Sequence, residues 1–196
     1  MVKDIYVGAN GSDPRYLTVA NGVLFFRADN GINGPELWKT DGTSAGTVVV
    51  KDINSGSSSS SIFNLTTVGS TLFFAANDGS NGQELWKSDG TSAGTVMVKN
   101  IRTGGLSSSP NYLTAVGSTL FFSANDGTNG QELWKSDGTS AGTVLVKDIR
   151  TGSVSSSISF TYNHAGTLYF GANDGSTGIE LWKSNGTSAG TVMVKD

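Results

Sequence analysis

The four tryptophans of the chain recur at one fixed interval, and this period constrains the fold more than any other feature. They are Trp38, Trp86, Trp134 and Trp182, each 48 residues after the one before. A chain of equal units predicts a repeat architecture, because each unit must bury its apolar face against its neighbours. We therefore divide the single repeat domain into four units at approximately residues 6–53, 54–101, 102–149 and 150–196.

Each unit contains four short segments typical of β-strands. In the third unit they are residues 112–116, 119–125, 131–136 and 143–149, which are rich in β-branched and aromatic residues and separated by Gly, Asn and Asp. No segment carries a helical period. Four short strands every 40–50 residues indicate a β-propeller blade. We predict an all-β fold, a β-propeller built from four 48-residue, four-stranded antiparallel blades per chain, with the first strand of each blade at the axis. A β-helix is the alternative, but it would normally use shorter coils and fewer tight hairpins.

Composition excludes several kinds of partner. The net charge is −3 with 15% charged residues, so no basic patch favours nucleic acid. No apolar run approaches the roughly 18 residues of a membrane helix. The chain has no cysteine, which excludes disulfides and thiolate metal sites. We expect no nucleic-acid partner, no membrane partner and no cofactor.

An eight-residue motif follows the same period. Glu-Leu-Trp-Lys-Ser-Asp-Gly-Thr begins at Glu84 and Glu132, with near copies at Glu36 and Glu180, the last carrying Asn185 in place of Asp. The motif resembles the bacterial ELWxxDGT repeat, found in tandem in large, mostly secreted or surface proteins, and the resemblance covers the whole chain. It implies a propeller-like repeat region outside the cell or at its surface, and it implies no reaction. The first residues, MVKDIYVG, lack the features of a signal peptide, so we expect a cytoplasmic protein or part of a longer one.

We interpret the motif as structural. Its Asp opens a hairpin loop and can accept backbone hydrogen bonds, as Asn185 also can, whereas a catalytic carboxylate would not survive as an amide. Its Trp is expected to pack between blades rather than to offer a platform for sugars. The motif positions are Glu36, Trp38, Asp41, Glu84, Trp86, Asp89, Glu132, Trp134, Asp137, Glu180, Trp182 and Asn185.

The motif Glu is predicted to fix the strand register. With residues 137–142 as the hairpin loop, regular antiparallel counting places Trp134 opposite Leu145 and Glu132 opposite Lys147. The same count pairs Glu36 with Lys51, Glu84 with Lys99, and Glu180 with Lys195. On this basis a Glu132→Gln change costs little stability and no binding.

Two further groups are candidate sites. The loops that begin at Asp78, Asp126 and Asp174 are rich in oxygen ligands and invite a calcium interpretation. The first unit reverses the order to Asp29-Asn30, which favours a turn over a metal. His164 is the only histidine and has no repeating partner, so we expect no catalytic residue.

These features favour a non-catalytic β-propeller repeat module, acting as a scaffold or an adhesion or interaction domain of a larger secreted or surface protein. The alternative is a carbohydrate-binding propeller lectin with one shallow site per blade. It rests on Tyr16, Tyr112 and Phe160 at one aligned position, where the second unit has Asn64. We do not expect an enzyme, although one could be built where the first and fourth units diverge from the others.

Self-association is expected as well. An open row of four blades exposes an apolar face at each end, too large to leave in water. Either the row closes as a four-bladed ring or two chains complete an eight-bladed ring, and we favour the dimer. A glycan or a protein is the expected further ligand.

Overall fold

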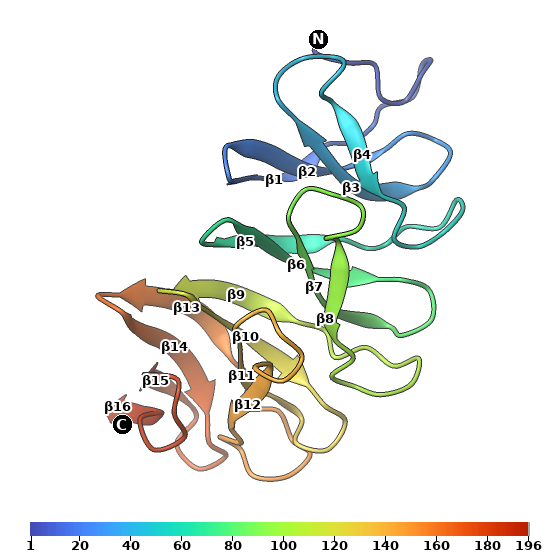
Figure 1. The fold of residues 1–196 in the computed structure, drawn as a ribbon. Helices are drawn as coiled ribbons and strands as arrows, with labels where there is room; N and C mark the ends of the chain where they lie inside the picture. The colour runs from blue at the N-terminus through green and yellow to red at the C-terminus, as the bar shows by residue number, and fades with distance from the viewer. Residues whose placement is uncertain (196) are drawn as a thin grey trace.

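The computed structural model describes residues 1–195, which form four four-stranded antiparallel sheets and no helix (Figure 1). Strand order within each sheet follows chain order. The first two sheets contain β1 (Arg15–Ala20), β2 (Val23–Asp29), β3 (Pro35–Thr40), β4 (Val48–Lys51), and β5 (Phe63–Val68), β6 (Thr71–Asn77), β7 (Gln83–Ser88), β8 (Val96–Lys99). The others contain β9 (Asn111–Val116), β10 (Thr119–Asn125), β11 (Gln131–Ser136), β12 (Val144–Lys147), and β13 (Ser159–His164), β14 (Thr167–Asn173), β15 (Ile179–Ser184), β16 (Val192–Lys195). The predicted fold class is confirmed, and we call the sheets blades 1 to 4.

The blades are stacked face to face in a curved row, with the first strand of each blade along the concave side (Figure 1). Strand β5 contacts both β1 and β9, and β9 contacts β13. The row is open, because β1 and β13 lie at its opposite ends. Each end blade therefore has one face that no other blade covers.

The hydrophobic core consists of three layers, one between each pair of neighbouring blades. Between blades 2 and 3, Phe73 and Leu85 pack against Phe122 and Trp134, all buried. The other two layers repeat this arrangement. Successive side chains of the second strand point to opposite faces, so each blade contributes to two layers and the uninterrupted Leu-Phe-Phe run is buried on both sides. Burial of one such side chain stabilises the fold by about 1.5–3 kcal/mol, which holds the blades together.

Threonine hydroxyl groups join the inner strands of neighbouring blades. Thr66 donates to the carbonyl oxygen of Leu113 at 3.1 Å, and the hydroxyl groups of Thr114 and Thr161 are hydrogen-bonded at 2.6 Å. These bonds supplement the apolar layers at the concave side, where blades approach one another most closely. They add polar contacts between the inner strands of neighbouring blades.

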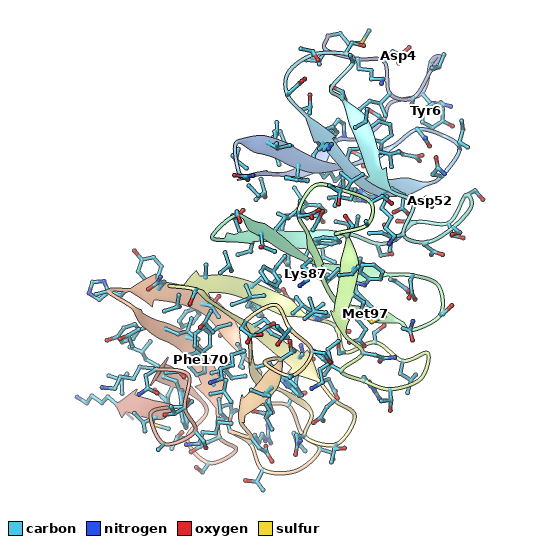
Figure 2. All side chains as sticks on the ribbon, viewed as in Figure 1. Asp4, Tyr6, Asp52, Lys87, Met97 and Phe170 are labelled. Carbon is cyan, nitrogen blue, oxygen red and sulfur yellow. The ribbon has the colours of Figure 1, made fainter. Side chains whose placement is uncertain are left out.

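Residues 1–14 form no strand, yet they cover part of blade 1. Ile5 packs on the cluster of Phe26, Ala28 and Trp38, and the Lys3 ammonium donates to the carbonyl of Thr47 at 2.7 Å. Figure 2 shows Asp4 and Tyr6 at this end of the row, with Phe170 of blade 4 near the other. On the face of blade 1 that has no neighbouring blade, this segment takes the place of a preceding unit. No helix in the described residues is long and apolar enough to cross a membrane.

Candidate functional site

The motif glutamates of the first three blades hold the connections between blades. Glu84 is fully buried, and its carboxylate accepts the N–H of Ile101 at 2.9 Å, the N–H of Ser108 at 3.0 Å and the Ser108 hydroxyl at 2.6 Å. Glu132 accepts the N–H groups of Ile149 and Ser156 at 2.8 and 2.9 Å. Each carboxylate therefore receives donors from the end of its own blade and from the connection to the next.

The predicted Glu–Lys pairing is wrong. Trp134 does lie opposite Leu145, but the register then shifts and Leu133, not Glu132, lies opposite Lys147. Val146 is the extra residue, a β-bulge that regular counting does not anticipate. The same shift occurs in the other three blades, so the pairs Glu36–Lys51, Glu84–Lys99 and Glu180–Lys195 are corrected in the same way. Within residues 1–195 the ion pairs lie at Asp13, with Arg15 and Arg27, and none joins a motif Glu to a Lys.

The bulge sends the lysine to the neighbouring blade. The Lys147 ammonium donates to the carbonyl of Thr191 at 2.8 Å and lies 5.7 Å from the ring centre of Trp182. Lys51 has the same relation to Trp86. The Trp side chains are each 6% exposed and lie in the layers between blades, or under residues 1–14 in the case of Trp38. They offer no open face to a sugar.

Burial perturbs the motif carboxyls. Loss of hydration raises the pKa of Glu36 and of Glu132 to about 7, against the opposing effect of the hydrogen bonds they accept. Desolvation also raises the pKa of Glu84. Carboxyls with pKa values near neutrality are frequent in active sites. Here the carboxylates face the connections that follow their own blades, and none of them lines the four surface grooves described for residues 1–195.

The motif Asp closes the hairpin loop, as predicted. Asp137 accepts the N–H and the hydroxyl of Thr139 at 2.8 and 2.7 Å, and these bonds lower the pKa of its carboxyl. Asn185 accepts the same two bonds from Thr187 at 3.0 and 2.8 Å. The role requires one acceptor oxygen and no charge, which explains why an amide serves in blade 4.

The proposed calcium loops are turns in which the carboxylates bind their own backbone. Asp126 accepts the N–H groups of Thr128 and Asn129, each at 2.8 Å. Asp78 makes the equivalent bonds, and in Asp174 the hydrogen bond from the Ser176 N–H lowers the carboxyl pKa to about 2. Within residues 1–195 no three Asp, Glu or His side chains lie together as metal ligands would.

Sequence reasoning missed a strained position on the concave side. Tyr16, Asn64, Tyr112 and Phe160 occupy one aligned place in the inner strands, and all have a left-handed backbone, with φ of 58°, 56°, 55° and 26°. Each lies where the pairing of the inner strand is irregular. The three aromatic side chains are exposed. Asn64 was the available signal, because Asn tolerates this conformation better than aromatic residues do.

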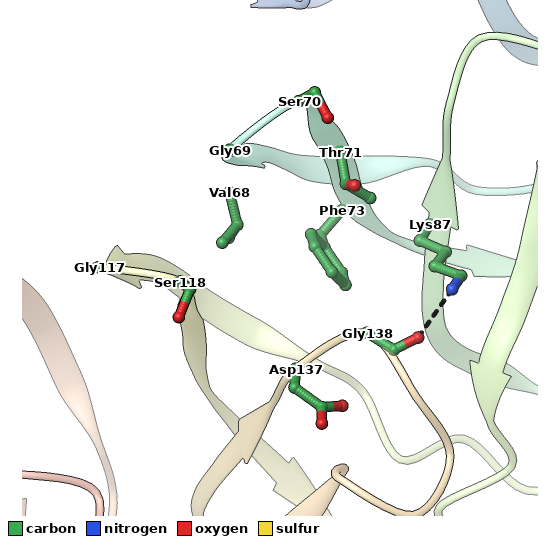
Figure 3. A pocket seen from close by; sticks show the side chains of 10 residues that line it. All are labelled: Val68, Gly69, Ser70, Thr71, Phe73, Lys87, Gly117, Ser118, Asp137 and Gly138. Carbon is green, nitrogen blue, oxygen red and sulfur yellow. Dashed lines mark hydrogen bonds between the residues drawn. The ribbon is translucent and has the colours of Figure 1, made fainter.

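A groove of about 430 Å³ lies between blades 2 and 3 (Figure 3). Its charged residues are Asp137 and Lys87, and the Lys87 ammonium already donates to the carbonyl of Gly138 at 2.8 Å. Hydroxyl groups of Ser70, Thr71 and Ser118 complete its polar lining, and no histidine lines it. Asp137 is the one carboxylate among the lining residues, whereas glycosyl transfer typically uses two.

No family model matches the chain, and no matching relative is found among curated proteins. Solved structures do resemble it. Two structures of puromycin hydrolase match 92% and 94% of this chain with TM-scores of 0.64 and 0.62, both at 13% identity. A prolyl endopeptidase matches 91% of it with a TM-score of 0.53 at 12% identity.

The likeness is one of fold. The chain spans less than a third of the length of these hydrolases, since it covers 29%, 30% and 28% of them. At such low identity the match extends to the arrangement of blades and to nothing chemical. It agrees with a propeller-like arrangement of the four sheets.

Proposed function

We propose that this chain is a non-catalytic propeller-type repeat module, acting as a scaffold or an adhesion or interaction domain of a larger secreted or surface protein. The observation that carries the proposal is the use of the motif in blades 2 and 3. Glu84 holds a connection, Trp134 fills a layer between blades, and Asp137 closes a turn. In these two blades the carboxylates of the motif Glu and Asp are already hydrogen-bonded within the fold. The resemblance to tandem repeats of surface proteins supports a place outside the cell.

The two ends of the row support self-association into an eight-bladed ring. Leu181 of blade 4 is 42% exposed and Val194 is 46% exposed, whereas their equivalents Leu133 and Val146 are 0% and 6% exposed against the next blade. Blade 1 presents the opposite type of face, on which residues 1–14 cover Phe26 and Trp38, each 6% exposed. Faces of these two types already pack together three times inside the chain. A two-fold axis lets two copies make both remaining contacts.

Static light scattering at micromolar concentration tests this proposal, with the mass of two chains as the expected result. A Leu181→Asp variant should have the mass of one chain, because it places a charge in the junction. Leu106→Asp is the matched control, since Leu106 is exposed in a connection away from the end faces. A wild-type mass of one chain would reject the self-association.

A lectin is the second candidate, favoured by the exposed aromatic side chains of the concave side. Tyr16, Tyr112 and Phe160 occupy the same position in blades 1, 3 and 4, and their side chains are exposed where the backbone bulges. Aromatic faces of this kind can stack on sugar rings. A glycan array with wild type and with Tyr112→Asn, the residue type of blade 2, tests this function. The lectin function is supported if a glycan binds the wild type and binds Tyr112→Asn more weakly, and it is contradicted if no glycan does so.

A further inference from the structure

The junction between copies needs a polar anchor as well as apolar faces, and blade 4 carries one. Resting on the proposed self-association, we infer that Glu180 is the docking residue for a second copy and receives the backbone N–H groups of Ile5 and Ser12 of that copy. The inference identifies a specific hydrogen-bonding site at the end of the row. It follows from the internal connections, which use the same residue types at the same spacing.

Glu84 and Glu132 each accept the N–H of an Ile 17 residues later and of a Ser 24 residues later, and Glu36 accepts the N–H of Ile53 at the first of these spacings. Glu132 binds the N–H groups of Ile149 and Ser156 in this way, and the Ser156 N–H also reaches the carbonyl of Gln131 at 3.1 Å. The same spacing counted from Glu180 runs beyond residue 196. The equivalent positions four 48-residue units earlier are Ile5 and Ser12.

Glu180 differs from its three equivalents as this spacing requires. It is only half-buried, and it makes no hydrogen bond or ion pair within residues 1–195, whereas Glu36, Glu84 and Glu132 are fully buried. The nearby Lys183 also differs from its equivalents in the other blades. Lys135 donates to the carbonyl of Gly186 in the next blade at 2.8 Å, but Lys183 has no such partner in the described residues. By the same spacing, the carbonyl that would accept from Lys183 is that of Gly42 in blade 1 of a second copy.

Residues 1–14 already present the donors. The Asp29 N–H donates to the carbonyl of Ser12 at 2.9 Å, just as the Asn77 N–H donates to Ser60 at 2.8 Å in the next blade. Lys3 reaches Thr47 as Lys51 reaches Thr95. The segment therefore has the shape of an internal connection while it lacks the Glu that such a connection binds. Its own Glu180 cannot serve, because it lies at the far end of the row (Figure 1).

A second copy would bring a duplicate strand end to this junction. The sequence Val-Lys-Asp occurs both at residues 2–4 and at residues 194–196. These two segments occupy the same position of the repeat, so Lys195 of a docked copy would need the Thr47 carbonyl that Lys3 already occupies. Docking of blade 4 must therefore displace residues 2–4, and the donors at Ile5 and Ser12 remain to bind Glu180.

The test is the dimer dissociation constant, measured by light scattering or sedimentation over a dilution series. Glu180→Met keeps the length of the side chain and removes both acceptors. We expect its Kd to rise at least tenfold, about 1.4 kcal/mol, with an unchanged circular dichroism spectrum. Ile5→Pro removes one of the two N–H donors on the partner copy. Because Glu180 and Ile5 act through the same contact, the variant with both changes should have a Kd no higher than that of the single variant with the higher Kd. Deletion of residues 2–4 should leave the Kd unchanged or lower it.

Glu132→Met is the matched internal control, expected to lower the stability of the fold through a connection that no second copy supplies. A dimeric wild type with the same Kd in Glu180→Met would overturn the inference and leave self-association standing. A monomeric wild type would instead reject the self-association itself. Weaker dimers in Glu180→Met but not in Ile5→Pro would assign Glu180 a different donor, which also contradicts the inference.

Discussion

The buried carboxylate of Glu84 gives the most direct prediction for the stability of the fold. In Glu84→Met the side chain keeps its length and loses both acceptor oxygens. The Ser108 N–H and hydroxyl retain the carbonyl of Gln83, at 3.0 and 3.3 Å, but the Ile101 N–H loses its acceptor. A buried donor left without a partner costs about 1–3 kcal/mol, so we expect a loss of roughly 2 kcal/mol in the free energy of unfolding.

Glu84→Gln should be milder. Its amide oxygen can take the Ile101 N–H and the Ser108 hydroxyl, while its NH₂ group faces the Ser108 N–H, which keeps the Gln83 carbonyl. We expect a loss of about 1 kcal/mol, near the net value of one hydrogen bond. This replaces the earlier expectation, made for Glu132, that such an amide costs little.

Urea unfolding followed by tryptophan fluorescence at one protein concentration measures both effects. The control is Asp89→Asn, which makes the same chemical change in an exposed turn of the same blade, and it should stay within about 0.5 kcal/mol of wild type. A Glu84→Met variant as stable as wild type would refute the reasoning. So would equal losses in the two Glu84 variants, because the graded effect depends on one acceptor being restored.

Three further predictions concern pH, a turn and a strained backbone. The folded state holds the pKa of Glu36 and Glu132 at about 7, above the ordinary 4.5, so it binds more protons and stability should fall as pH rises between those values; urea midpoints at pH 5 and pH 8 test this, and a higher midpoint at pH 8 would contradict it. Gly94→Ala places a Cβ against the carboxylate of Asp89 and should cost about 1–3 kcal/mol in urea unfolding, whereas a neutral result would show that the turn can relax. Tyr112→Asn relieves an aromatic residue at φ of 55° and should raise the free energy of unfolding by about 1 kcal/mol, and a lower melting temperature would count against strain.

The sequence was sufficient to predict the blades because their signals are local and repeated. In the third blade, β10 and β11 have the predicted bounds. The strand predicted over residues 143–149 is shorter, and ends at Lys147, because the chain turns there and brings the Ile149 N–H to Glu132. The turn role of Asp137 was likewise predictable, since Asn185 showed which property the position needs.

The register at the motif Glu was not predictable by counting. Counting assumes a regular ladder, and the bulge at Val146 moves Lys147 by one place. The consequence is large, because Glu132 changes from a surface ion-pair partner into a buried acceptor. The strained inner-strand residues were missed for a related reason, since a residue such as Tyr112 gives no local sign of a positive φ.

The glutamate connections also affect how the chain finds its fold. Blades 2 and 3 share the segment from Glu84 to Val96 letter for letter with that from Glu132 to Val144, so the contacts that hold a connection specify a type of blade and not its number. A connection that binds the motif Glu of another blade would bury nearly the same surface. Only the short covalent link between each connection and its own blade disfavours this non-native contact. During refolding at high concentration, neighbouring chains offer equivalent glutamates and equivalent faces. Exchange of whole blades between molecules is therefore the misfolding route that this degree of repetition leaves open.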